Sequence, residues 1–195
     1  IGGLALSRTY RQIGLPCKLF EAVPGLKPLG LGISLQPSAL RELFDLGLEP
    51  ALPAIGVETR DYGMYSKRGL HIWTEPRGRF AGYRWPQYSV HRGRLHMLLY
   101  RTLLDRAATP AAGPAGHNRT NVVETGWTAT GFENAGGEAV LHLQSPSGET
   151  RVERGAILIG ADGIHSAIRR QMVPDEGEPV WGGAVLWRGT SQARP

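Results

Sequence analysis

Residues 156–170 constrain the fold of this chain more than any other stretch. Ala156-Ile157-Leu158-Ile159 is an unbroken aliphatic run, and it stops at Gly160-Ala161-Asp162-Gly163. Beyond that turn, Ile164, Ala167 and Ile168 recur at the spacing of one helix face. The stretch therefore predicts a buried strand over 156–159, a tight turn, and a helix that carries these three apolar residues on one side.

The predicted turn places a carboxylate, Asp162, between two glycines. Open α/β sheets bind ligands where the carboxyl end of a strand meets the amino end of a helix. Backbone N–H groups and the helix dipole attract phosphate or ribose oxygens there. The residues alone leave two interpretations open: a ligand-binding turn, or a plain connection in which the glycines only supply the required backbone conformation.

The amino-terminal segment has the pattern of the second half of a dinucleotide-binding βαβ unit. Gly2 and Gly3 precede a helical pattern over 4–12, and Cys17 to Glu21 is a short strand pattern that ends in an acidic residue. Glu21 follows Gly3 by eighteen positions, close to the separation at which a carboxylate binds ribose hydroxyls. The alternative is that Glu21 is an ordinary surface residue at the end of a strand.

Periodicity and turn residues predict further elements along the chain. Arg92 and Arg94 fall in the first turn of one predicted helix, where positive charge opposes the helix dipole unless something anionic lies nearby. We expect a glycine- and proline-rich loop over 24–32, helices over 37–46 and 91–106, a hairpin of strands 62–66 and 70–74, a flexible connection over 107–116, a β-meander of strands 122–127, 139–144 and 149–154 leading into 156–159, and further strands over 83–90 and 184–188.

Composition argues against several classes of protein. The 195 residues are 41% hydrophobic and 20% charged, as in an ordinary globular protein. The net charge of +5 is spread along the chain without a basic stripe, and a phosphate-bearing cofactor explains it equally well, so we expect no nucleic-acid partner. The single cysteine, Cys17, excludes an internal disulfide and a cysteine-based zinc cluster, and indicates a cytoplasmic protein. No apolar run approaches the roughly 20 residues that cross a bilayer.

Taken together, several motifs closely resemble those of the FAD-dependent aromatic hydroxylases, flavoprotein monooxygenases of the p-hydroxybenzoate hydroxylase type. The resemblance covers essentially the whole chain, and the motifs that carry it are Ile1-Gly2-Gly3-Leu4-Ala5-Leu6, Glu21, Pro28-Leu29-Gly30-Leu31-Gly32-Ile33, His91-Arg92-Gly93-Arg94-Leu95 and Gly160-Ala161-Asp162-Gly163-Ile164-His165-Ser166-Ala167-Ile168-Arg169. Within the family, the chain looks most like the hydroxylases of phenazine pigment biosynthesis, through segments 32–37, 85–93 and 182–189.

The resemblance implies an α/β, Rossmann-like FAD-binding fold, a parallel sheet with an inserted β-meander, and it gives the matched residues roles. Gly3, with Gly2 beside it, would be the last glycine of the FAD fingerprint and let the helix approach the pyrophosphate. Glu21 would bind the adenosine ribose. Gly32 would let the backbone pass close to the flavin side of FAD, and Arg92 would reach the phosphates or the ribityl chain.

The same resemblance extends to the turn. Asp162 and Gly163 belong to a motif that in this family touches the FAD pyrophosphate and is associated with NAD(P)H use, while Ser166 and Arg169 would keep the turn in shape. The implied reaction is the hydroxylation of a small aromatic, phenazine-like substrate with NAD(P)H and O2. Because the cofactor carries that chemistry, no catalytic residue and no metal ligand are assigned.

The resemblance also suggests how the chain is divided. An FAD-binding domain would occupy 1–178, with inserted β-segments around 60–90, and a substrate-binding sheet would start in 179–195. The first strand and leading glycines of the fingerprint are missing, as is a later Gly-Asp motif, so we expect a truncated chain that binds FAD poorly and is inactive by itself. Two alternatives stay open: a flavin reductase or dehydrogenase of the same fold, and a non-catalytic remnant or binding module.

Overall fold

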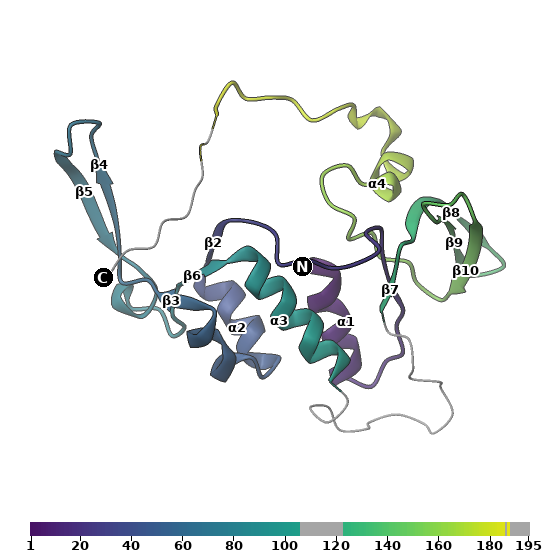
Figure 1. Ribbon diagram of the computed structural model, residues 1–195, viewed down its shortest axis with the longest axis horizontal. Coiled ribbons are helices and arrows are strands. Elements are labelled where there is room, and N and C mark those ends of the chain that lie inside the picture. The colour runs from purple at the N-terminus through teal and green to yellow at the C-terminus, as the bar shows by residue number, and fades with distance from the viewer. Residues whose placement is uncertain (106–122, 186, 188–195) are drawn as a thin grey trace. The chain divides into compact units, whose positions relative to one another are not determined.

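The computed structural model describes residues 1–105, 123–185 and 187. This part of the chain consists of two compact units, each with contacts mainly among its own residues, and Figure 1 shows their helices and strands. The first unit contains residues 1–26 and the described residues between 102 and 185. The second contains residues 27–101 together with Trp187.

The first unit begins with a helix and a parallel pair of strands. Helix α1 (Gly2–Gln12) is followed by strand β1 (Leu19–Glu21), as the amino-terminal pattern predicts. Strand β1 pairs in parallel with β7 (Val123–Thr125), residue for residue along its whole length. This parallel pair confirms the α/β character of the fold, and it places Glu21 at the carboxyl end of β1.

An antiparallel meander completes the first unit. Strands β8 (Thr128–Ala135), β9 (Glu138–Gln144) and β10 (Thr150–Gly155) form a sheet in the order β10-β9-β8. The sequence did not predict β8, and the predicted strand 122–127 is instead the short β7. The register of β8 shifts between Ala129 and Gly131, which interrupts the two-residue alternation that identifies a strand.

The prediction of a buried strand over 156–159 is wrong. These residues belong to no strand of the described chain, and Ile157 and Ile159 are 75% and 44% exposed. An aliphatic run favours a strand only when a neighbouring strand pairs with its backbone, and within the described chain β1 pairs only with β7.

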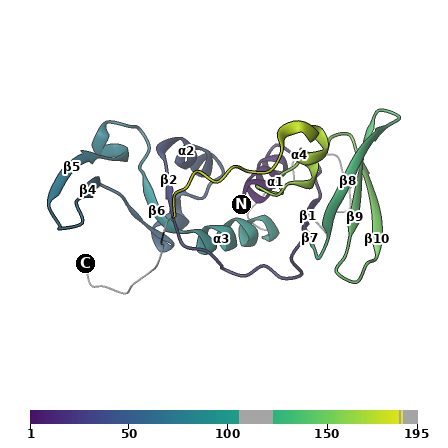
Figure 2. The ribbon, with the colours of Figure 1, turned by 90° about the horizontal axis from the view of Figure 1, so that it is seen from above.

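The helix that follows also begins later than its apolar spacing suggests. Helix α4 spans Ala167–Met172 with Ser166 as its N-cap, and Ile164 is 62% exposed. A short 3-10 helix, η3 (Pro174–Glu176), follows α4. Helix α4 lies beside the meander (Figure 2), and the Gln171 side-chain amide both accepts from the backbone N–H and donates to the backbone C=O of Phe132 in β8, at 2.8 and 2.5 Å.

The core of this unit lies between the meander and α4. Leu141, Leu143 and Ile168 are buried there. Partly buried side chains pack around them, namely those of Phe20, Trp127, Ala129, Phe132 and Leu158.

The second unit is a small antiparallel sheet with helices. Its strands β2 (Gly32–Leu35), β6 (Tyr88–His91) and β3 (Gly56–Glu58) are arranged in the order β2-β6-β3. Helix α2 (Pro37–Asp45) follows β2, and the helix η1 (Glu49–Ala54) precedes β3. The predicted strand over 83–90 begins only at Tyr88, after the buried Pro86, because proline has no N–H for a sheet.

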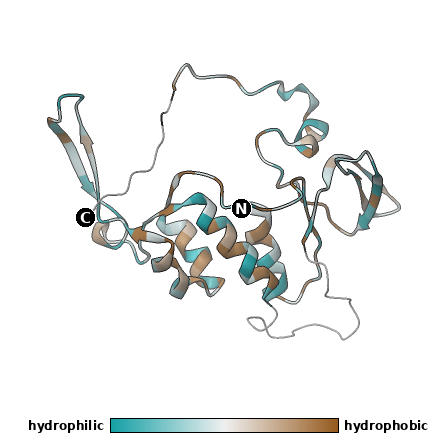
Figure 3. Cartoon of the chain, viewed as in Figure 1, coloured by the Kyte–Doolittle hydropathy of each residue, from teal (hydrophilic) through white to brown (hydrophobic). Residues whose placement is uncertain are grey.

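Helix α3 (Arg92–Leu104) begins in the second unit, and its last residues belong to the first. Leu95, Leu99 and Leu103 are buried, as the sequence predicts, and Figure 3 shows polar and apolar residues interleaved along α3. In the second unit the other buried apolar residues are Leu35, Leu40, Leu43, Leu46, Leu48, Leu52 and Val90.

The predicted hairpin is present in the second unit. Strands β4 (Asp61–Tyr65) and β5 (His71–Pro76) pair with each other, and the short helix η2 (Gly78–Ala81) follows them. Most of the hairpin is exposed. Of the predicted strand 184–188, Ala184, Val185 and Trp187 lie in no strand; its other residues, and the predicted connection 107–116, lie outside the described residues.

Candidate functional site

The amino end of α1 has the geometry of an anion site. The first intrahelical bond runs from Ala5 N to Ile1 O at 3.0 Å, so the N–H groups of the preceding helical residues point out of the helix end. The N-cap residue supplies no side-chain bond, and the first turn carries no acidic residue. Nothing lies within 4 Å of the point where a Cβ on Gly2 would stand. This end of the helix therefore carries backbone donors without a side-chain cap, and Gly2 adds no side chain beside them.

Gly3 lies where α1 meets both β1 and the turn before α4. A Cβ at Gly3 would stand 2.8 Å from Leu19 Cδ1 and 3.5 Å from the Cβ of Ala161. The glycine thus allows a close approach between the helix, the strand that ends in Glu21, and the residue next to Asp162. The structure brings these predicted site residues of the first unit to one region.

Glu21 is held by contacts at the end of β1. Its Oε1 accepts a bond from Val23 N at 3.2 Å, and its carbonyl oxygen accepts one from Trp127 N at 3.0 Å. The loop that follows is tied to the end of β7 because Thr125 Oγ1 donates to Pro24 O at 2.9 Å. The Glu21 side chain is partly buried, so its position depends on how β1, β7 and Trp127 are held.

A network of hydrogen bonds shapes the turn around Asp162. Gly163 has a positive φ of 83°, a conformation that favours glycine. Asp162 Oδ1 accepts from Ser166 Oγ at 2.5 Å, and its Oδ2 accepts from Ile168 N at 3.3 Å. Ser166 Oγ also accepts from Arg169 N at 2.9 Å, which caps α4. Both carboxylate oxygens of Asp162 therefore hold the turn to the helix.

These contacts also set the charge of the carboxyl group. Partial burial raises the pKa of Asp162, but the hydrogen bonds from Ser166 Oγ and from backbone N–H groups outweigh burial and bring the pKa below its usual range. Asp162 is thus ionised at neutral pH, as an acceptor of these bonds.

Arg169 closes the turn from the other side. Its guanidinium donates to Ile164 O at 2.8 Å and pairs with Glu176 of η3, with Nε 2.8 Å from Oε2. The sequence resemblance gave Ser166 and Arg169 the task of keeping the turn in shape, and the structure contains the contacts for it. Shallow open depressions flank this turn, one lined by Gly160, Asp162 and Gly163, the other by His165 and Arg169.

In the second unit, Gly32 and Arg92 lie at the junction of β2, β6 and α3. Gly32 pairs with His91, and Arg92 N donates to Leu31 O at 2.8 Å. The Arg92 side chain is exposed. The structure therefore brings the backbones of Gly32 and Arg92 to neighbouring positions, and the Arg92 side chain lies against Gly30.

Two further glycines make this junction possible, and the sequence had not singled them out as site residues. A Cβ at Gly93 would stand 2.3 Å from the backbone C and O of Pro28, and Gly30, with φ +127°, would carry a Cβ 3.1 Å from that of Arg92. The sequence signals were that Gly30 lies in the glycine- and proline-rich loop and that Gly93 lies in the first turn of a helix, where no turn requires a glycine. The loop over 28–31 thus lies directly against the start of α3.

Within the described part of the chain, no helix is both long and apolar enough to span a membrane. Nor does that part contain a group of three or more His, Cys, Asp or Glu side chains that could hold a metal ion.

Comparison with known proteins gives these residues a context, although no family model matches the chain. The phenazine 1,6-dicarboxylic acid hydroxylase PhzS of Lysobacter antibioticus is 35% identical over 195 residues, which cover 98% of this chain and 45% of PhzS. The aurachin C monooxygenase/isomerase of Stigmatella aurantiaca is 33% identical over 190 residues, which cover 97% of this chain and 44% of that protein. The chain is related to the FAD-dependent monooxygenases.

Solved structures of such monooxygenases have the same fold. The flavin-dependent monooxygenase PieE, solved in complex with FAD and substrate, superposes with a TM-score of 0.68 at 17% sequence identity, covering 87% of this chain and 30% of PieE. The likeness confirms the expected fold, a Rossmann-like α/β fold of the FAD-binding monooxygenases. The chain spans less than half the length of the monooxygenase relatives it matches.

Proposed function

We propose that this chain is the FAD-binding part of a monooxygenase that hydroxylates an aromatic, phenazine-like substrate. The observation that carries the proposal is the close approach at Gly3, which puts the donor end of α1 beside β1 and Ala161. The chain is also similar over nearly its whole length to a phenazine hydroxylase. FAD, when bound, supplies the redox chemistry, in which NAD(P)H and O2 are consumed and one oxygen atom enters the substrate.

The residues of the first unit fit the adenosine diphosphate half of FAD. The amino end of α1 offers N–H donors and no acidic side chain to a pyrophosphate. Glu21 offers a carboxylate oxygen to ribose hydroxyls from the carboxyl end of β1. Donors face the anionic group and an acceptor faces the hydroxyls, as binding requires.

The Asp162 turn would act mainly through its backbone. Both oxygens of the Asp162 carboxylate already accept hydrogen bonds within the turn, and a second anion beside them would be repelled. We therefore assign any contact with a cofactor phosphate to the backbone of Asp162 and Gly163. The carboxylate, with Ser166, holds that backbone in place.

Gly32 and Arg92 would contact the flavin side of the cofactor. The exposed guanidinium of Arg92 can pair with a phosphate or bond to ribityl oxygens. The glycine at 32 has nothing within 4 Å of its absent Cβ, so a flat ligand can approach its backbone. The division into an FAD-binding domain over 1–178 and a substrate-binding sheet from 179, and the cytoplasmic location, are part of the same proposal.

The test uses the protein that the natural gene encodes around this sequence. We expect it to purify with bound FAD and to consume O2 with NAD(P)H when a phenazine carboxylic acid or another fused aromatic acid is added, with a hydroxylated product in the mass spectrum. Bound flavin without substrate-dependent O2 uptake would instead indicate a reductase or dehydrogenase. A protein that retains no FAD would indicate a non-catalytic module.

A further inference from the structure

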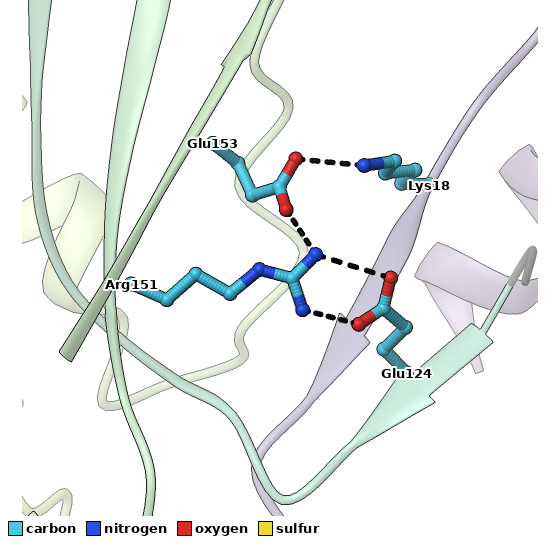
Figure 4. A network of polar contacts seen from close by, with 4 residues as sticks. All are labelled: Lys18, Glu124, Arg151 and Glu153. Atoms are coloured by element: carbon cyan, nitrogen blue, oxygen red, sulfur yellow. Dashed lines mark hydrogen bonds and ion pairs between the residues drawn. The ribbon is translucent and has the colours of Figure 1, made fainter. Parts of the chain in front are cut away.

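A single arginine connects the meander to the parallel strand pair of the first unit. Arg151 of β10 donates to both carboxylate oxygens of Glu124 in β7, at 2.5 and 3.4 Å. It also pairs with Glu153, which in turn bonds to Lys18 at 2.8 Å (Figure 4). Lys18 directly precedes β1, so the network joins β10 to both strands of the pair.

The same guanidinium lies against two aromatic rings. Arg151 Cζ is 5.6 Å from the ring centroid of Phe20 and 5.5 Å from that of Trp127, within the range of a cation–π contact. Phe20 lies directly opposite Glu124 in the β1–β7 register. One side chain thus contacts β1, β7 and the residue that leads into β8.

These contacts surround the position of Glu21. Glu21 follows Phe20 in β1, and its carbonyl oxygen accepts the backbone N–H of Trp127. Its strand partner Thr125 follows Glu124. Successive side chains of a strand point to opposite faces, so Arg151 packs on the face of the pair opposite to that of the Glu21 side chain.

Both strands of the pair are short. Strands β1 and β7 have three residues each and pair only with each other in the described chain. Without Arg151, the carboxylates of Glu124 and Glu153, whose side chains are only 17% and 16% exposed, would lose the cation between them. The repulsion between these two carboxylates, and the cost of keeping them from water without a cation, would destabilise β7 and its register with β1.

We propose that Arg151 is a positioning residue for Glu21, which it holds through β7, Phe20 and Trp127 in the place from which the Glu21 carboxylate binds the ribose of FAD. This inference rests on the proposed FAD-binding function. It concerns a residue to which the proposed function assigns no contact with the cofactor.

The test is a double-mutant cycle on the full natural protein, stripped of flavin, with the dissociation constant for added FAD measured by flavin fluorescence. Arg151→Met and Glu21→Gln are each expected to weaken binding by about tenfold. In the Glu21→Gln background, Arg151→Met is expected to cost less than about twofold, because the residue through which Arg151 acts is already disabled. An arginine that merely supports the fold would cost the same in both backgrounds.

Two further variants keep the measurement interpretable. Arg154→Met is the matched control, because Arg154 lies on the same strand, has an exposed side chain and, among the residues that the structure describes, forms one long 3.7 Å pair, with Glu138. It should leave FAD affinity unchanged. Arg151→Lys keeps the positive charge but loses the bidentate hydrogen bond to Glu124. Its affinity for FAD should therefore lie between those of wild type and Arg151→Met. It also replaces the methionine variant in the cycle if the latter does not fold.

The outcomes separate the two proposals. Wild-type protein that binds no FAD would overturn the proposed function and this inference together. If wild-type protein binds FAD and Arg151→Met binds it equally tightly, only the role given to Arg151 is overturned. The same holds if Arg151→Met loses the same affinity for FAD in the wild-type and Glu21→Gln backgrounds.

Discussion

Ser166 Oγ donates a 2.5 Å hydrogen bond to Asp162 Oδ1 and accepts one of 2.9 Å from Arg169 N. One hydroxyl therefore caps α4 and fixes the carboxylate of the turn that precedes it. Ser166 is buried, so no water replaces it readily when it is removed.

Ser166→Ala should destabilise the protein by about 1–2 kcal/mol, because it removes a helix cap and leaves an Asp162 oxygen without its donor. Chemical denaturation measures the change. Ser147→Ala is the control, since Ser147 is exposed in the β9–β10 turn, and it should change stability by less than about 0.5 kcal/mol. Equal effects of the two variants would contradict the role of Ser166.

The Asp162 turn should also weaken in acid. The folded-state pKa of Asp162 is lowered. The ionised carboxylate therefore contributes to the free energy of unfolding above the unfolded-state pKa of about 4, and this contribution is lost as pH falls through the folded-state pKa. Asp162→Asn should therefore be less stable than wild type at pH 7, and the difference in melting temperature should shrink toward pH 2. A difference that stays constant across this range would show that ionisation of Asp162 is not involved.

Gly93→Ala tests the contact between the 28–31 loop and α3. Alanine is the better helix former by about 1 kcal/mol, yet its Cβ would stand 2.3 Å from the Pro28 backbone. Since a backbone cannot move aside as a side chain can, we expect a net loss of about 1–3 kcal/mol. Gly2→Ala, measured without FAD, is the control: it also lies in a helix, with open space around it, and it should be neutral or slightly stabilising.

Gln171→Ala should loosen α4 from the meander. The Gln171 amide satisfies both backbone groups of Phe132 on the outer strand β8, and their loss should cost about 1–3 kcal/mol. Hydrogen exchange at the Phe132 amide should accelerate as well. Met172→Ala, at a neighbouring side chain that is 67% exposed, should change neither quantity. Unchanged exchange at Phe132 in Gln171→Ala would refute the contact.

The sequence correctly predicted the elements whose stabilising residues lie close together along the chain. The helices over 4–12 and 37–46 follow from apolar spacing and terminal glycines, and the 62–74 hairpin follows from alternation around Gly69. The 156–159 run has the composition of a buried strand, but pairing depends on a neighbour far away in the sequence. The start of α4 is set by a Ser166 side chain whose partner, Asp162, no periodicity reveals.

The candidate site likewise contains residues that sequence patterns reveal and residues that only the structure reveals. Gly2, Gly3 and Glu21 carry a recognisable spacing, and Asp162 lies in a recognisable turn. Gly93 and Arg151 do not, because their contacts with Pro28 and Glu124 join residues that are more than twenty positions apart. Their importance depends on tertiary packing, which the sequence encodes only through the whole fold.

The β4–β5 hairpin has a consequence for handling the protein. Within the described chain its two strands pair only with each other, so each presents an open edge. Leu70, Ile72 and Trp73 are 66%, 63% and 45% exposed on it. Open edges with apolar side chains recruit other strands. At high concentration this hairpin should therefore nucleate aggregation, and a lysine in place of Ile72 should raise the solubility limit without touching the cofactor residues.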